Sequence, residues 1–326
     1  MINKSLAIIF FGRYPDPGKC KTRLARTLVG TKENFREAAA LYRLCCERTI
    51  RRFIEEADAL VNADFDEAER VKIVFACADA EDVPRVKEWI CSFASDSNGV
   101  VSKTECDDNR DEVINQCQDN KQRYFEDCES VGGKRRDVEV RAQDGASANL
   151  GTRMILEINK EFDRFDCDDS DDRGSKLVAV IGTDYPDASM KLFRRQHRLQ
   201  RRRTNGTDDD DDDDDKKDNM EFGEAKDGGF WFVSSRKRVS LNAFDGVRWS
   251  TINAREDAMK AVELNNNDRN VVKAFSASED EALYDIDTLD DLRKWFAKAE
   301  EASDEDKNDL FYSLVRAVIE KEKTGT

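Results

Sequence analysis

The sequence Leu6-Ala7-Ile8-Ile9-Phe10-Phe11 runs directly into Gly12-Arg13-Tyr14-Pro15-Asp16-Pro17-Gly18-Lys19-Cys20-Lys21-Thr22-Arg23-Leu24. The first stretch is β-branched and aromatic and is bounded by glycine, which predicts a short buried strand. In the second stretch two prolines and two glycines restrict the backbone, and four cations crowd together. A strand that feeds a cationic loop just before a helix is a common phosphate-binding arrangement in α/β proteins. The loop matches neither the Walker motif nor G-x-G-x-x-G, so a solvated turn with scattered charges stays open as the alternative.

Composition restricts the class of protein. The 326 residues suffice for one large domain or two small ones. The net charge of −16 argues against general binding to nucleic acid, although half of it lies in the aspartate run 208–215. No apolar stretch approaches membrane-spanning length, and the N-terminus lacks the pattern of a signal peptide. We therefore expect a cytoplasmic protein with no membrane partner.

Cysteine and histidine usage limits the possible chemistry. The nine cysteines show no paired spacing, so we expect reduced thiols. Cys106, Cys117 and Cys128 recur every eleven residues, but a zinc site is disfavoured because no C-x-x-C and no nearby histidine accompany them. The single histidine, His197, lies in a basic stretch and is expected on a solvated helix face. Chemistry must then depend on carboxylates, Lys, Arg and a metal ion.

Periodicity predicts alternating strands and helices, which is typical of a mixed, mainly parallel sheet covered by helices. Further strands are expected at 71–76, 138–141, 177–181, 229–233 and 270–275. Helices are expected at 33–57, 83–93, 150–162, 251–264, 288–299 and 305–320. The polar segment 95–136 and the low-complexity segment 201–219 are predicted insertions.

Acidic residues recur at the predicted ends of strands. They are Asp184, Asp227, and the pair Asp285 and Asp287. Open α/β sheets bind ligands at this edge, and carboxylates gathered there favour a cation such as Mg²⁺ or Mn²⁺. Ordinary turns at Asp184 and Asp227 remain the alternatives. Thr288 is expected to cap the helix that follows.

Two predicted helix starts add candidates. Asn149-Leu150-Gly151-Thr152-Arg153-Met154 opens a helix whose amide groups and arginine could face an anion, or it could be a plain helix start. Ser250 or Thr251 is expected to cap the helix after Trp249. Trp249 could belong to the core or to the wall of a pocket.

Six motifs in this order resemble one family of transferases. The motifs are PDPGKCKTRL (15–24), NLGTRM (149–154), IGTDYP (181–186), KDGGFWF (226–232), VRWST (247–251) and LYDIDTLDDL (283–292). The chain is similar to the bacterial-type transferases associated with radical-SAM and selenium gene neighbourhoods, a glycosyltransferase-like family. That family is placed in the nucleotide-diphospho-sugar transferase superfamily, and the molybdenum-cofactor and 2-phospholactate guanylyltransferases are more distant relatives. The chain departs from the pattern at Asn149, Tyr185, Lys226 and Leu289.

The resemblance implies a fold and a division into domains. It implies the GT-A (Rossmann-like) α/β fold with helices on both faces of the sheet. We expect a single domain over residues 1–300, interrupted by the two insertions, and a C-terminal helical extension over 301–326.

The resemblance also implies roles for particular residues. Lys19, Lys21, Arg23 and Asp184 would be catalytic. Nucleotide-binding residues would be Gly12, Arg13, Pro17, Gly18, Thr22 and Arg153. The acceptor side would be lined by Asp227, Gly228, Gly229 and Trp249. The metal would be bound by Asp184, Asp287 and Asp285.

The leading hypothesis is a metal-dependent transferase that uses a nucleoside triphosphate or a nucleotide-sugar and an unknown small-molecule acceptor. Nucleotidyl and glycosyl transfer are both compatible with the residues. A nucleotide-binding module without turnover, or a scaffold acting through the charged insertions, are the alternatives.

Overall fold

The computed structural model describes residues 4–28, 34–62, 69–94, 136–145, 147–168, 176–196, 220–265, 282–301, 307 and 309–324. The predicted insertions lie outside these residues except for Arg136, which begins a strand. The predicted strand at 270–275, His197 and the cysteines at 106, 117 and 128 also lie outside them. In the described part of the chain Cys20, Cys45, Cys46, Cys77 and Cys91 form no disulfide bond. No helix in these ranges is both long enough and apolar enough to cross a membrane.

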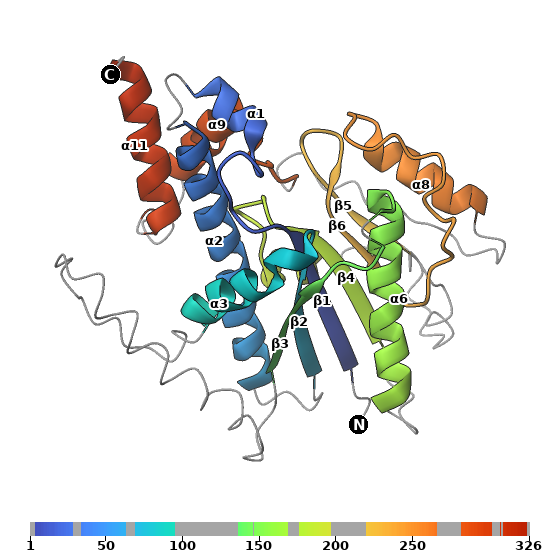
Figure 1. Ribbon diagram of the computed structural model, residues 1–326. Helices are drawn as coiled ribbons and strands as arrows, with labels where there is room; N and C mark the ends of the chain where they lie inside the picture. The colour runs from blue at the N-terminus through green and yellow to red at the C-terminus, as the bar shows by residue number, and fades with distance from the viewer. Residues whose placement is uncertain are drawn as a thin grey trace, which may run out of the picture.

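A six-stranded mixed sheet forms the centre of the molecule (Figure 1). Its strands are β1 (Lys4–Gly12), β2 (Glu69–Cys77), β3 (Arg136–Ala142), β4 (Lys176–Gly182), β5 (Glu221–Glu224) and β6 (Phe230–Ser235). The order is β3-β2-β1-β4-β6-β5, with β3, β2, β1 and β4 parallel and β6 antiparallel to both of its neighbours. The predicted α/β class with a mixed, mainly parallel sheet is confirmed.

Helices cover both faces of the sheet, as predicted. They are α1 (Thr22–Thr27), α2 (Asn34–Asn62), α3 (Val83–Ala94), α6 (Leu150–Asp168), α8 (Ala254–Asn265), α9 (Leu289–Glu300) and α11 (Leu310–Thr324), with a 3-10 turn η1 (Ala80–Asp82) before α3. Alternate residues of β1 point to opposite faces, so Ile8 packs with α2 and α3 while Ile9 packs with α6. A third apolar cluster joins α1, α2, α9 and α11.

Two helices begin later than the sequence predicts, and one strand was not predicted. Helix α8 begins at Ala254 rather than at 251, because Ser250 has a left-handed φ of 61° and residues 251–253 form a turn. Helix α11 begins at Leu310, where Asp309 Oδ1 accepts a hydrogen bond from the Tyr312 amide. Strand β5 was not predicted, because four residues with a central glycine give no usable alternation.

The cap of α9 is confirmed. Thr288 Oγ1 accepts a hydrogen bond from the Asp291 amide, and Asp291 Oδ2 accepts one from the Thr288 amide. This reciprocal capping box fixes the start of α9. It also fixes the direction in which Asp287, directly before the cap, enters the site described below.

Candidate functional site

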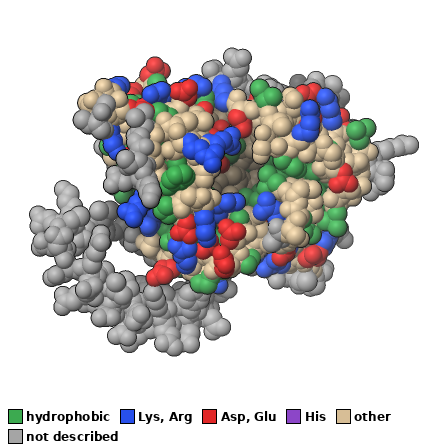
Figure 2. All heavy atoms as spheres, turned by 45° about the horizontal axis from the view of Figure 1, so that its top comes forward, with side chains coloured by type: hydrophobic (Ala, Val, Ile, Leu, Met, Phe, Trp, Pro, Cys, Tyr) green, Lys and Arg blue, Asp and Glu red, His purple; other side chains and the backbone are tan. Residues whose placement is uncertain are grey.

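A pocket of about 390 Å³ opens at the carboxyl ends of β1 and β4. Figure 2 looks onto this end of the sheet and shows Lys, Arg and acidic side chains grouped around a central hollow. The pocket walls come from the loop after β1, the turn after β4, the start of α6 and the segment before α9. Nine of the predicted site residues line the pocket: Gly12, Arg13, Lys19, Lys21, Thr22, Arg23, Arg153, Asp184 and Asp287.

The loop between β1 and α1 is held by its own backbone. Gly18 takes a φ of 83°, which glycine tolerates, and the Lys19 amide donates to the Asp16 carbonyl at 3.1 Å. Arg13 Nη1 donates to the Lys19 carbonyl at 2.9 Å and thereby closes the loop. Lys21 has a left-handed φ of 45°, a costly conformation for a non-glycine residue. These constraints direct the Lys21 side chain inward, whereas Pro17 and Gly18 stay on the outer side of the loop and do not line the pocket.

Lys21 joins the two predicted metal-binding aspartates. Its Nζ lies 2.8 Å from Asp184 Oδ2 and 2.6 Å from Asp287 Oδ1, and its side chain is only 7% exposed. Burial by itself lowers the pKa of Lys21, but the two carboxylates outweigh burial and raise the pKa. Burial favours the neutral form of Asp287, yet Lys21 and Arg23 hold the pKa of Asp287 below its ordinary value. Asp184 and Asp287 therefore meet in space, as predicted, and a cation already lies between them.

Arg13 and Arg153 form the cationic side of the pocket. Within the described ranges, no carboxylate pairs with either guanidinium. Arg153 Nη1 donates to Gln143 Oε1 at 2.7 Å, while Arg153 Nε is buried and no described residue accepts its hydrogen. Burial and the nearby charge of Arg13 lower the pKa of Arg153. Two neighbouring guanidinium groups without a carboxylate partner are a suitable site for an anion.

Lys19 and Arg23 are placed differently from Lys21. Lys19 is half exposed and lies 3.6 Å from Asp16 and 3.7 Å from Asp82, so acids outside the pocket neutralise much of its charge. Arg23 is exposed and pairs with Asp287 at the pocket rim. The loop thus places Lys21 inside the pocket and places Lys19 and Arg23 at the edges of the pocket.

Sequence reasoning missed two supporting residues. The Tyr42 hydroxyl, from α2, lies 3.0 Å from Thr183 Oγ1 and accepts a hydrogen bond from the Arg13 amide. Gln143, directly after β3, holds Arg153 as described above. A polar residue at a strand end was a usable signal for Gln143, but Tyr42 lay within an apolar helix face and gave none.

Asp285 and Asp227 lie beside the pocket and do not line it. Burial, followed by the charges of Asp227, Asp184 and Asp287, raises the pKa of Asp285 to about 7. The two residues extend the acidic side of the site toward the turn that was predicted to face an acceptor.

We predict that Asp285 makes the stability of the metal-free protein depend on pH. Between about pH 4 and pH 7 the folded protein holds a proton on Asp285 that the unfolded chain has released, so stability falls as pH rises. Asp285→Asn should remove that cost and gain on the order of 4 kcal/mol at pH 8 relative to pH 4. Urea unfolding in the presence of EDTA measures this change. Asp245→Asn at an exposed position is the control, and parallel pH profiles for wild type and Asp285→Asn would contradict the prediction.

The predicted acceptor residues Asp227, Gly228 and Gly229 form a tight turn before β6. Asp227 Oδ1 accepts from the Gly229 amide at 2.8 Å, and Gly228 takes a φ of 85°. A Cβ on Gly228 would lie 1.9 Å from the Ile252 carbonyl oxygen. Trp249 stacks edge-on against Phe230 and Phe244 and covers Gly151 at the start of α6, so it is half-buried packing outside the pocket.

Gly228→Ala is expected to destabilise the protein by about 3 kcal/mol, because the new methyl group meets backbone and because the positive φ is strained. Gly246→Ala is a matched control, since Gly246 has a φ of 82° and open space around it. Only the conformational cost, about 1 kcal/mol, should appear there. Equal midpoints of thermal unfolding for the two variants would show that the contact with residue 252 is unimportant.

The carboxylate groups of the pocket partly fit a divalent cation. Carboxylate oxygens are the ligands that Mg²⁺ and Mn²⁺ prefer, and Asp184 and Asp287 supply them at one point. Among the residues that the structure describes, no group of three or more His, Cys, Asp and Glu side chains could hold a metal ion. Asp184 and Asp287 could thus provide one or two ligands, as Mg²⁺ often receives from proteins, with phosphate and water completing the shell.

Comparison with known proteins supports the fold. Residues 104–251 match a family model described as an uncharacterized protein conserved in bacteria (DUF2064). A candidate nucleotide-diphospho-sugar transferase from Desulfovibrio desulfuricans G20 superposes with a TM-score of 0.56 at 21% identity, over 97% of this chain and 97% of that one. This likeness shows the shared α/β fold. No curated protein matches the sequence.

Two further solved structures align with lower scores. They are 4-diphosphocytidyl-2C-methyl-D-erythritol synthase from Anaerococcus prevotii DSM 20548 (10% identity, 91% of this chain, 99% of that chain, TM-score 0.39) and CMP:2-keto-3-deoxy-manno-octonic acid synthetase complexed with CTP (11%, 91%, 100%, 0.37). Neither score is high enough to carry an argument about this chain.

Proposed function

We propose that the protein transfers a group from a phosphate-activated donor, a nucleoside triphosphate or a nucleotide-sugar, to a small-molecule acceptor. The observation that carries the proposal is the arrangement of the pocket. Arg13 and Arg153, which have no carboxylate partner among the residues that the structure describes, lie on one side, and Asp184 and Asp287 lie on the other. The motif resemblance to the glycosyltransferase-like family and the fold of the D. desulfuricans relative support the same class.

In this proposal the guanidinium groups of Arg13 and Arg153 bind the donor phosphates and offset charge as the bond to the leaving group breaks. Lys21 holds Asp184 and Asp287 in alignment through its two ion pairs. Those two carboxylates would hold Mg²⁺ or Mn²⁺, which supplies further stabilisation of phosphate charge when bound. Tyr42 and Thr183 keep the backbone at Arg13 in place.

Two reactions fit this machinery. In nucleotidyl transfer an acceptor oxygen attacks the α-phosphorus, a new P–O bond forms, and pyrophosphate leaves. In glycosyl transfer an acceptor attacks the sugar carbon, the bond between the sugar and the phosphate oxygen breaks, and a nucleoside diphosphate leaves. The acidic group of Asp227 and Asp285 lies next to the pocket and is the proposed acceptor side.

A thermal-shift screen of nucleoside triphosphates and nucleotide-sugars, with and without Mn²⁺, tests the proposal. A donor at 100 times its dissociation constant should stabilise the protein by about 2.7 kcal/mol. The stabilising donors are then incubated with candidate acceptors, and release of pyrophosphate or nucleoside diphosphate identifies the reaction. Binding without release of either product from any donor would favour a nucleotide-binding module, and the absence of any shift would contradict the proposal.

A further inference from the structure

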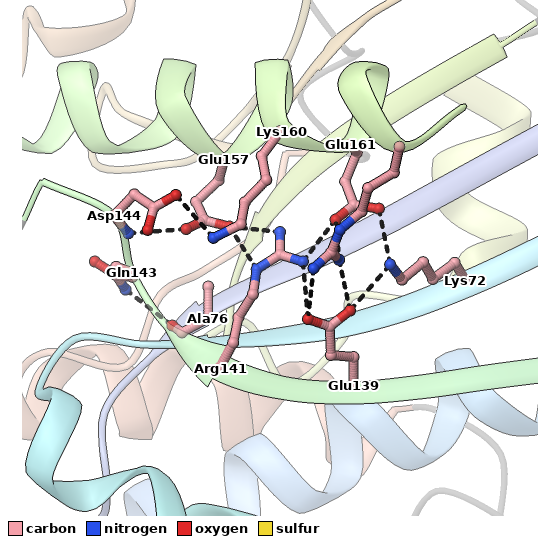
Figure 3. Close-up of polar contacts among 10 residues, drawn as sticks. Lys72, Ala76, Glu139, Arg141, Gln143, Asp144, Glu157, Lys160 and Glu161 are labelled. Carbon is pink, nitrogen blue, oxygen red and sulfur yellow. Dashed lines mark hydrogen bonds and ion pairs between the residues drawn. The ribbon is translucent and has the colours of Figure 1, made fainter. Parts of the chain in front are cut away.

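An ionic network lies between the sheet and α6 (Figure 3). None of its six charged residues lines the pocket. Three cations, Lys72, Arg141 and Arg164, meet three acids, Glu139, Glu157 and Glu161. Glu157 and Glu161 are completely buried. Arg141 is the centre, since its Nε donates to Glu157 Oε2 at 2.8 Å and its Nη1 donates to Glu161 Oε1 at 2.6 Å.

Stability alone does not account for such a network. Removing the charges of Arg141, Glu157 and Glu161 from water is expensive, and well-packed apolar residues of similar volume often stabilise a protein at least as well. Elsewhere α6 packs on the sheet through apolar side chains, among them Ile155, Ile158 and Phe162. What charged, directional contacts add is a fixed alignment of α6 along β2 and β3.

That alignment leads to the pocket. Glu157 also accepts, through Oε1, the amide hydrogen of Asp144 at 2.9 Å, so it ties α6 to the segment that follows β3. The residue before Asp144 is Gln143, whose Nε2 donates to the Ala76 carbonyl and whose Oε1 receives Arg153. Arg153 lies one helical turn before Glu157 on α6. Glu157 therefore links the helix that carries Arg153 to the segment that carries Gln143.

We propose that Arg141 and Glu157 are positioning residues that hold the Arg153 guanidinium toward the donor phosphate. This inference rests on the proposed function, because it assigns Arg153 to a bound anion. The structural part of the inference does not depend on the ligand: the network between the sheet and α6 sets the orientation of the Arg153 side chain in the pocket.

The test is a calorimetric titration with inorganic pyrophosphate and Mg²⁺ on the full chain. The variants are the apolar pair Arg141→Met with Glu157→Leu, then Gln143→Met, Arg153→Met, and the apolar pair combined with Arg153→Met. Lys160→Met is the matched control. Lys160 lies on the same helix, and the substitution removes its partly exposed ion pair with Asp144 without changing the ion pairs of Arg141.

We expect the apolar pair to remain cooperatively folded and to bind pyrophosphate roughly five- to tenfold more weakly. Gln143→Met, which leaves the network intact, should show a similar loss and covers the case in which the apolar pair does not fold. On the Arg153→Met background the apolar pair should cause no further loss, because its effect passes through Arg153. Lys160→Met should bind as wild type does.

The outcomes separate the two proposals. If Arg153→Met weakens binding while the folded apolar pair binds normally, the positioning role of Arg141 and Glu157 is wrong and the anion site stands, whatever Gln143→Met does. If the apolar pair does not fold, normal binding by Gln143→Met overturns the positioning role. If the apolar pair weakens pyrophosphate binding further on the Arg153→Met background, the positioning role is also wrong. If Arg153→Met binds pyrophosphate as wild type does, the assignment of the anion site fails and the positioning role fails with it.

Discussion

Lys21→Met is expected to lower the free energy of unfolding by about 3 kcal/mol at neutral pH. The substitution keeps most of the side-chain volume but removes the ammonium group that lies within 2.8 Å of both Asp184 and Asp287. Two carboxylates that are each partly buried would then face each other without the ammonium group between them, and only Asp287 would keep a cationic partner, the exposed Arg23. Breaking a fully buried pair costs about 3–5 kcal/mol, and the lower end applies here because Asp184 is 32% exposed.

The effect of Lys21→Met should depend on pH. Lys21 holds the pKa of Asp287 below its ordinary value, so the stability that it contributes is present at neutral pH and is lost as acid protonates the carboxylate. Urea unfolding of wild type and variant should therefore converge toward pH 3. Lys19→Met is the control, since Lys19 is 47% exposed and its ion pairs are long, and it should cost much less stability than Lys21→Met. Equal losses for both lysines would contradict the structural assignment of Lys21.

Asp184→Asn is expected to reduce turnover roughly 10²- to 10³-fold, with little loss of fold. Asparagine keeps the shape of the side chain and can still accept a hydrogen bond from Lys21, but it removes the charge that the proposed metal needs. The Mn²⁺-dependent part of the thermal shift caused by a bound donor should disappear, while the metal-independent part, which depends on Arg13 and Arg153, should remain.

Asp187→Asn is the matched control for this experiment. Asp187 lies three residues further along the same turn, accepts a hydrogen bond from Trp295 Nε1 at 3.0 Å, and does not line the pocket. It should retain turnover. A full metal-dependent shift in Asp184→Asn, or equal losses in both variants, would mean that Asp184 does not bind the metal.

Much of the fold could be predicted from local sequence. The apolar runs around Ile8, Val74 and Val180 are buried on both sides in a parallel sheet, which is why continuous β-branched stretches identified them. The cap at Thr288 followed from side-chain chemistry within one turn. Strand β5 was not predicted, because its extended conformation depends on pairing with β6 rather than on its own four residues.

The site could be predicted less completely, because its geometry depends on contacts between distant segments. Strand-end position brought Asp184, Asp287 and the cationic loop together correctly. The loop sequence does not reveal that Lys21 turns inward while Lys19 meets Asp82 outside, since a left-handed φ at residue 21 makes that difference. The link from Gln143 to Arg153 required β3 and α6 to be placed side by side.

The most direct test of the proposed phosphate site is the anomalous scattering of Mn²⁺ in crystals grown with inorganic pyrophosphate. We expect Mn²⁺ bonded to a carboxylate oxygen of Asp184 or Asp287 inside the pocket, with pyrophosphate oxygens against the guanidinium groups of Arg13 and Arg153. Pyrophosphate bound away from both arginines, or Mn²⁺ remote from both aspartates, would contradict the account.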